Sequence, residues 1–234
     1  MFKPIQPYGD PIGILAVDAS ATFEAGVVLQ RDATTGEMAL SDGSAPLGFA
    51  GENKTVAYTG KVVDESAVLN GVVATNLNKT NLTADQVKVT NSAGDTEYTE
   101  TTDYTVNDTN GTITRVALGA IGDGDTVLVS YQYTKSSVEL LNAQPLGTDD
   151  TAGSGNVTIW NAPGIYATDQ YDIVRTYALN QLLYVNTGIV TNTNSGLSAG
   201  APVIGRVFKV PVGGVDTPSE PNPDMLYVEF NIQL

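Results

Sequence analysis

Carboxylates are the main acid and base groups that this sequence offers for catalysis, because the chain contains no histidine and no cysteine. The usual proton shuttle and the thiol nucleophile are therefore missing. A pair of carboxylates could still serve a glycosidase. The acidic residues, however, fall mainly in turn sequences such as Asp123-Gly124-Asp125 and Asp149-Asp150, where aspartate accepts hydrogen bonds from the local backbone. The sequence thus predicts a protein that is not an enzyme and has no catalytic residue.

The Asp123-Gly124-Asp125 turn is also the best candidate for a metal site. With Asp103 or Asp108 nearby, it would offer the hard oxygen ligands that Ca²⁺ prefers. The spacing lacks both the EF-hand pattern and its distal glutamate. Solvated turns are therefore the prediction, and we expect neither a metal nor a cofactor.

A group of tyrosines could serve binding instead of catalysis. Tyr166, Tyr171, Tyr177 and Tyr184 could line a sugar-binding face or an oligomer interface, and we favour the interface because interfaces are enriched in tyrosine. Arg175 lies among them, where it would pair with an acidic residue of a partner or cover a strand edge.

The first eight residues form a second candidate contact segment. Phe2, Pro4, Ile5 and Tyr8 place aromatic and apolar side chains on an arm that shows neither helix nor strand periodicity. A segment stiffened by proline loses little entropy on docking, so the arm could strap onto a neighbouring subunit. The alternative is that it folds against its own domain.

The elements that must position these residues are strands. Leu226 to Leu234 alternates apolar and polar residues with a period of two, and Thr126 to Thr134 is rich in β-branched and aromatic residues. The best helical candidate, near Leu140 to Pro145, is cut short by proline. Trp160 is predicted to be a core anchor. An all-β fold made of sandwiches, barrels or both is expected.

Proline usage predicts two domains, one inserted into the other. All eleven prolines lie before residue 50 or after residue 140, and residues 61–135 are rich in threonine, asparagine and aspartate. Within 61–135, the strands flanking Asn110-Gly111 read as a hairpin, with Thr126 to Thr134 as its partner strand. We expect an immunoglobulin-like β-sandwich at 61–135, inserted into a compact β-barrel or β-tulip domain formed by residues 1–60 and 136–234.

Charge and hydropathy exclude several partners. Eleven basic and 26 acidic residues give a net charge of −15, so long-range attraction to nucleic acid is not expected. No apolar run approaches the length of a membrane span, and prolines interrupt the N-terminal segment before any signal-like apolar region forms. We therefore expect no nucleic-acid partner and no membrane partner.

Several segments resemble structural proteins of tailed bacteriophages. One group resembles head decoration (cement) proteins: Ala21 to Leu29, Met38 to Leu40 and Ala45 to Phe49. A second group looks like the later half of virion proteins of that type: Gly164 to Asp172, Leu182 to Val185 and Pro202 to Val207. The stretch from Asp103 to Tyr133 is similar to the immunoglobulin-like modules that phages insert into capsid and tail proteins.

The resemblance implies a non-catalytic decoration protein on the outer surface of the virion head, made in the host cytoplasm. Its partners would be the phage major capsid protein and further copies of itself, with a trimer favoured. The discontinuous domain formed by residues 1–60 and 136–234 would bind the capsid, and the tyrosines, Arg175 and the arm would supply the contacts to capsid or subunit. A tail-tube, neck or baseplate subunit and a host-surface or carbohydrate-binding module remain alternatives.

Overall fold

A computed structural model of the chain describes residues 2–18, 21–51, 53–54, 59–136, 139, 156–197, 200–213 and 224–231. The chain divides into two compact units. Unit 1 comprises Met1–Ala57, Glu139–Pro211 and Met225–Leu234, and unit 2 comprises Tyr58–Val138 and Val212–Asp224. The sequence analysis instead predicted that Val212–Asp224 belongs to the flanking domain. The helical candidate near Leu140 and the Asp149-Asp150 pair lie outside the described residues.

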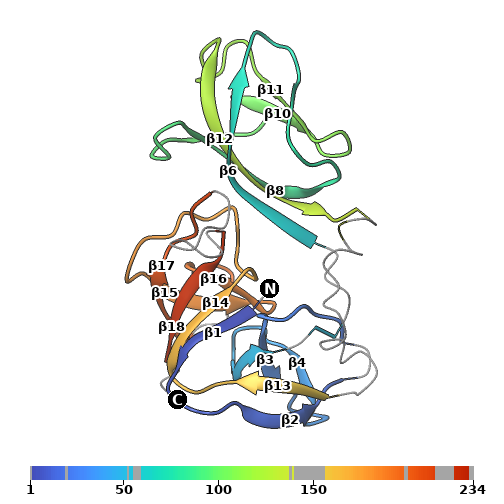
Figure 1. The fold of residues 1–234 in the computed structure, drawn as a ribbon, viewed down its shortest axis with the longest axis vertical. Coiled ribbons are helices and arrows are strands. Elements are labelled where there is room, and N and C mark those ends of the chain that lie inside the picture. The colour runs from blue at the N-terminus through green and yellow to red at the C-terminus, as the bar shows by residue number, and fades with distance from the viewer. Residues whose placement is uncertain are drawn as a thin grey trace. The chain divides into compact units, whose positions relative to one another are not determined.

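Strands dominate both units, so the expected all-β class is confirmed (Figure 1). All strand pairs in the described sheets are antiparallel. Each sheet has two free ends in its strand order, and none of the described sheets closes into a barrel. Open, packed sheets therefore take the place of the barrel that the sequence suggested. Among the described residues, no helix is long and apolar enough to cross a membrane.

Unit 1 contains two sheets. The six-stranded sheet has the order β1 (Phe2–Pro7), β14 (Gly164–Thr168), β18 (Leu226–Phe230), β17 (Gly205–Lys209), β15 (Leu182–Asn186) and β16 (Ile189–Thr191). The five-stranded sheet has the order β2 (Ile12–Ala16), β13 (Asn156–Trp160), β5 (Gly48–Ala50), β3 (Val28–Arg31) and β4 (Met38–Leu40).

Strand β18 shows how the period-two pattern fixes one face of the six-stranded sheet. Leu226, Val228 and Phe230 are buried and Glu229 is exposed, as the alternation predicts. Tyr227 departs from the pattern because it is also buried. It packs on the opposite face of the sheet in a small cluster with Ile165, Ala167 and Met225.

Aromatic rings join the two sheets of unit 1. Phe49 of the five-stranded sheet lies against Phe2, Tyr166 and Phe230 of the six-stranded sheet, with ring centroids 5.5, 5.6 and 5.1 Å away. Trp160 adds an edge-on contact to Tyr166 at 6.3 Å. Such pairs stabilise a core beyond the area that they bury. These rings therefore hold the two sheets together.

Unit 2 is a sandwich of two sheets. One has the order β6 (Thr59–Leu69), β12 (Asp125–Thr134), β8 (Leu82–Asn91) and β9 (Glu97–Tyr98). The other has the order β10 (Tyr104–Asn107), β11 (Thr112–Arg115) and β7 (Thr75–Asn76). Buried side chains from both sheets form one core, including Leu69, Val89, Ile113, Val129 and Tyr131.

The strand order of this sandwich differs from the expected immunoglobulin order. Lettered A to G along the chain, its sheets read AGCD and EFB, whereas an immunoglobulin constant domain has ABED and CFG. The predicted hairpin is confirmed, since β10 pairs with β11. The prediction that β12 pairs with this hairpin is wrong, because β12 pairs with β6 and β8 in the other sheet.

Candidate functional site

Three of the carboxylates singled out in the sequence accept hydrogen bonds from backbone amides of unit 2. Asp123 accepts a hydrogen bond from the Gly71 amide, and Asp125 accepts one from the Gly122 amide at 2.7 Å. Asp103 accepts from the amides of Thr99 and Ala120, each at 2.8 Å. Within the described ranges, no three acidic residues gather closely enough to hold a metal ion. These side chains stabilise loops of unit 2.

The two amide donors lower the pKa of Asp103 below its ordinary value of 3.8. A carboxyl whose pKa is lower in the folded state stabilises that state above the ordinary value, and this contribution disappears as the pH falls through the folded value. We therefore expect unit 2 to lose stability in acid partly through Asp103. Hydrogen exchange of the β10–β12 segments between about pH 5 and about pH 2 would measure this loss, and Asp103→Asn should flatten it. An unchanged pH dependence in this variant would contradict the role of Asp103.

The predicted contact tyrosines are core residues, so this part of the sequence interpretation is corrected. Tyr166, Tyr171 and Tyr177 are 0%, 2% and 8% exposed, and Tyr184 is half-buried. The Tyr166 hydroxyl donates to the Ala162 carbonyl at 2.8 Å. The Tyr177 hydroxyl donates to the carbonyls of Asp172 and Val190, and burial raises its pKa. Tyr166 and Tyr177 therefore satisfy their hydroxyls inside unit 1, and Tyr171 packs its ring edge-on against Tyr177.

Arg175 pairs with an acidic residue of its own chain. Its Nε lies 3.3 Å from Oδ2 of Asp172, three residues earlier, and the Arg175 side chain is 49% exposed. Arg175 thus forms a local ion pair, and a contact between its exposed part and a partner stays a prediction. Exposed pairs of this kind contribute little to stability.

The N-terminal arm is an edge strand of its own unit. β1 pairs with β14 from Phe2 to Pro7, and Phe2 stacks in the aromatic cluster. This is the second of the two alternatives for the arm, although the absence of strand periodicity was misleading. Pro4, Ile5 and Tyr8 are exposed, Tyr8 by 71%. Because proline has no N–H, Pro4 and Pro7 hinder pairing with a further strand.

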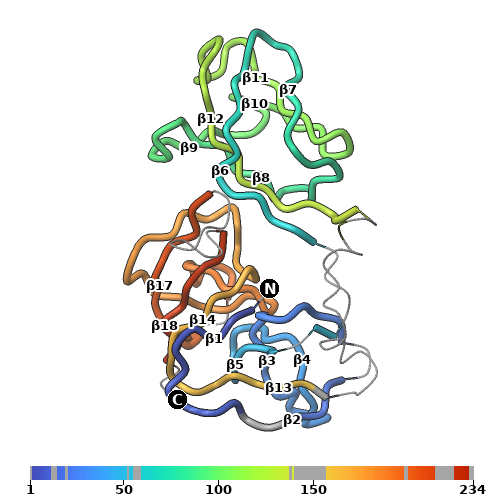
Figure 2. The backbone as a smooth tube through the Cα atoms, in the orientation of Figure 1, coloured from blue at the N-terminus to red at the C-terminus, as the bar shows by residue number. Residues whose placement is uncertain are grey.

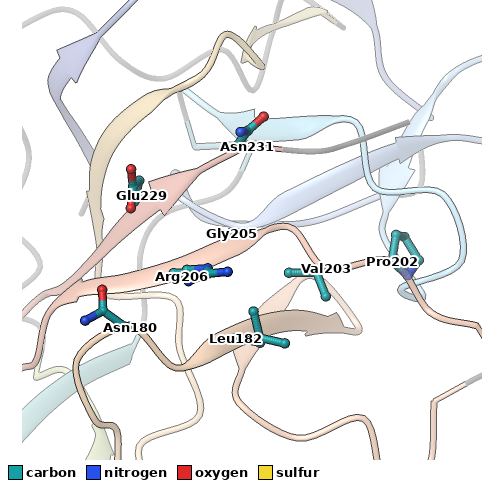
Figure 3. A pocket seen from close by; sticks show the side chains of 8 residues that line it. All are labelled: Asn180, Leu182, Pro202, Val203, Gly205, Arg206, Glu229 and Asn231. Carbon is teal, nitrogen blue, oxygen red and sulfur yellow. The ribbon is translucent and has the colours of Figure 1, made fainter.

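A surface hollow on unit 1 was not anticipated from the sequence (Figure 3). It has a volume of about 610 Å³ and lies on the outer side of β15, β17 and β18. The residues that line it are Asn180, Leu182, Pro202, Val203, Gly205, Arg206, Glu229 and Asn231. We call this surface, with the adjacent Leu179, the hollow face.

Strand register places the central residues of the hollow face. Arg206 of β17 is opposite Leu182 of β15 on one side and Glu229 of β18 on the other, so the three side chains share one face (Figure 3). Gly205 permits this close approach, because a Cβ there would lie 2.2 Å from the Glu229 carbonyl oxygen. Within the described part of the chain, neither Arg206 nor Glu229 forms an ion pair.

Apolar side chains lie beside these two charges. Leu179 and Leu182 are 63% and 40% exposed. Phe208 is 51% exposed, but it lies at the register shift between Val207 and Lys209, so alternation along β17 does not place it on the face of Arg206. A mixed apolar and charged surface of this kind is typical of a binding interface.

A second exposed apolar surface lies on unit 2. Val72, Val73 and Leu118 are 60%, 69% and 99% exposed, on the segments that follow β6 and β11. Figure 2 shows both segments at the same end of this unit. Arg115 ties them together, since its Nε donates to the Ile121 carbonyl and its Nη1 to the Gly71 carbonyl. We call Val72, Val73 and Leu118 the sandwich tip.

The fold and these surfaces define an all-β protein of two units, each of which exposes an apolar surface. A family model described as "Protein of unknown function UCP028589" matches residues 44–146, so this stretch is similar to that family. No curated protein and no solved structure matches the chain. The matched stretch includes strands β6 to β12, which form the sandwich of unit 2.

Proposed function

We propose that the chain is a non-catalytic protein that attaches to a regularly repeated surface, and that this surface is the outer face of a tailed-phage head. The observation that carries the proposal is that each unit exposes its own apolar surface, the hollow face on unit 1 and the sandwich tip on unit 2. A protein that reinforces a lattice needs at least two such surfaces, so that one molecule can hold more than one neighbour.

The energetics of a lattice favour modest surfaces such as these. Many weak contacts made at once give persistent attachment, because each later contact forms within an already bound assembly. Apolar side chains exposed in small groups supply contacts of this strength without making the free protein insoluble. The net charge of −15 keeps such a protein away from nucleic acid and keeps coated particles dispersed.

Binding to heads tests this proposal directly. Heads purified from a mutant phage that lacks this chain would be mixed with the purified protein and sedimented through sucrose. We expect the protein to sediment with the heads and to saturate at a fixed number of copies. Sedimentation with isolated tails instead, or assembly of the pure protein into rings or tubes, would favour the tail or baseplate alternative. Binding to neither, together with hits on a glycan array, would favour the carbohydrate-binding alternative.

The sandwich tip gives this proposal a prediction at residue level. The double variant Val73→Ser and Leu118→Ser should weaken retention on heads by about tenfold or more, because two apolar contacts of about 1 kcal/mol each are lost. Its stability should stay within about 0.5 kcal/mol of the parent, since both side chains are exposed. Ala93→Ser, at an exposed turn of the same unit, is the control. If heads retain the parent, the double variant and Ala93→Ser equally, the sandwich tip is not part of the docking surface.

A further inference from the structure

The hollow face carries an opposite pair of charges side by side. Arg206 and Glu229 are directly opposite each other on neighbouring strands and point to the same outer side (Figure 3). Neither forms an ion pair within the described residues, although directly opposite residues on neighbouring strands are close enough to interact. Both charges are therefore available to a molecule that binds this face.

The same face has apolar side chains beside a recess. Leu182 lines the hollow of about 610 Å³ and is 40% exposed, and Leu179, next to the lining residue Asn180, is 63% exposed. Exposed aliphatic side chains next to a recess supply apolar contacts in protein interfaces.

A surface that holds both members of a charge pair can bind a second copy of itself. Around a two-fold axis each residue contacts the partner's counterpart reciprocally, so the surface must be complementary to itself. A two-fold axis relates the two chains by a rotation of 180°. If this axis passes through the hollow face, Arg206 would meet the partner's Glu229, and Glu229 would meet the partner's Arg206. Charges covered by an interface must be paired, and this arrangement pairs both.

We propose that the hollow face is the interface of a two-fold symmetric homodimer. A different protein would need to supply the reverse charge pattern, whereas a second copy already has it. The proposal does not rest on the function proposed above, because the dimer would form in solution from the purified chain alone.

Charge reversal at the two positions separates contacts between chains from contacts within a chain. Arg206→Glu leaves two negative charges on the face, and Glu229→Arg leaves two positive charges. Each variant alone should be monomeric, because like charges would meet across the axis. Mixed in equal amounts, the two variants should form a one-to-one heterodimer, because a negative face then meets a positive face. A pairing within one chain would not be repaired by mixing.

The measurement is the molar mass in solution by sedimentation velocity, at concentrations up to about 100 μM, a range that reaches weak dimers. The parent should be a dimer, and each single variant should raise the dissociation constant at least tenfold. Mixing should restore the dimer to within a few-fold of the parent. Trp160 fluorescence of each variant verifies the fold of unit 1, and Ala93→Ser, at an exposed turn of unit 2, is the surface control. A monomeric or trimeric parent, dimeric single variants, or monomers that persist after mixing would each overturn the proposal.

Discussion

Replacing Phe49 with alanine is expected to destabilise unit 1 by about 3–5 kcal/mol, which is the usual loss for truncating a buried phenylalanine. Phe49 is 0% exposed and lies against three rings of the opposite sheet. The truncation removes these ring contacts and leaves a cavity where the two sheets meet. Because a domain is stable by only about 5–15 kcal/mol, the loss would leave unit 1 close to unfolding.

The single tryptophan makes this prediction easy to measure. Trp160 belongs to unit 1 and touches Tyr166 of the same ring cluster, so its fluorescence follows the unfolding of that unit in urea. The midpoint of the unfolding transition of Phe49→Ala should therefore lie at a much lower urea concentration than that of the parent. Tyr8→Ala is the matched control, because this aromatic residue of the same unit is 71% exposed and its loss should change stability by no more than about 0.5 kcal/mol. Equal shifts of the urea midpoint in Phe49→Ala and Tyr8→Ala would show that the ring cluster does not hold the sheets together.

Local patterns in the sequence predicted local structure well. Alternation predicted the buried face of β18, and Asn110-Gly111 predicted the hairpin between β10 and β11. Both signals depend on residues close together in the chain. The partner of β12 and the strand order of unit 2 depend on which distant strands meet, and hydrophobic periodicity carries no such information. Here the sequence interpretation was wrong.

Residue type was a poor guide to exposure at the predicted contact site. Tyrosine is common both in interfaces and in cores, and Tyr166, Tyr171 and Tyr177 are in the core, where the hydroxyls of Tyr166 and Tyr177 donate to backbone carbonyls and the Tyr171 ring packs against Tyr177. The hollow face was missed for the opposite reason. Arg206 and Glu229 are ordinary outward residues of their own strands, and only the register between β17 and β18 places them together.

Replacing Gly111 with alanine is expected to destabilise unit 2 by about 3 kcal/mol or more, from two separable causes. Gly111 has a φ of +62°, a conformation that costs an L-residue about 1 kcal/mol. In addition, a Cβ there would lie 1.8 Å from the Lys79 carbonyl oxygen, so the backbone around Lys79 must move. Strain at such a position and displacement of packed backbone are among the few mechanisms that give large effects.

Gly94 in the same unit separates the two causes. It has a φ of +75°, but a Cβ there would meet nothing within 4 Å. Gly94→Ala should therefore cost only the conformational part, about 1 kcal/mol. Urea unfolding of both variants, monitored by hydrogen exchange of the β10–β12 segments, gives the difference between their free energies of unfolding. That difference measures how firmly the hairpin is pressed against the segment at Lys79, and equal costs at the two glycines would mean that the hairpin turn is free to move away from it.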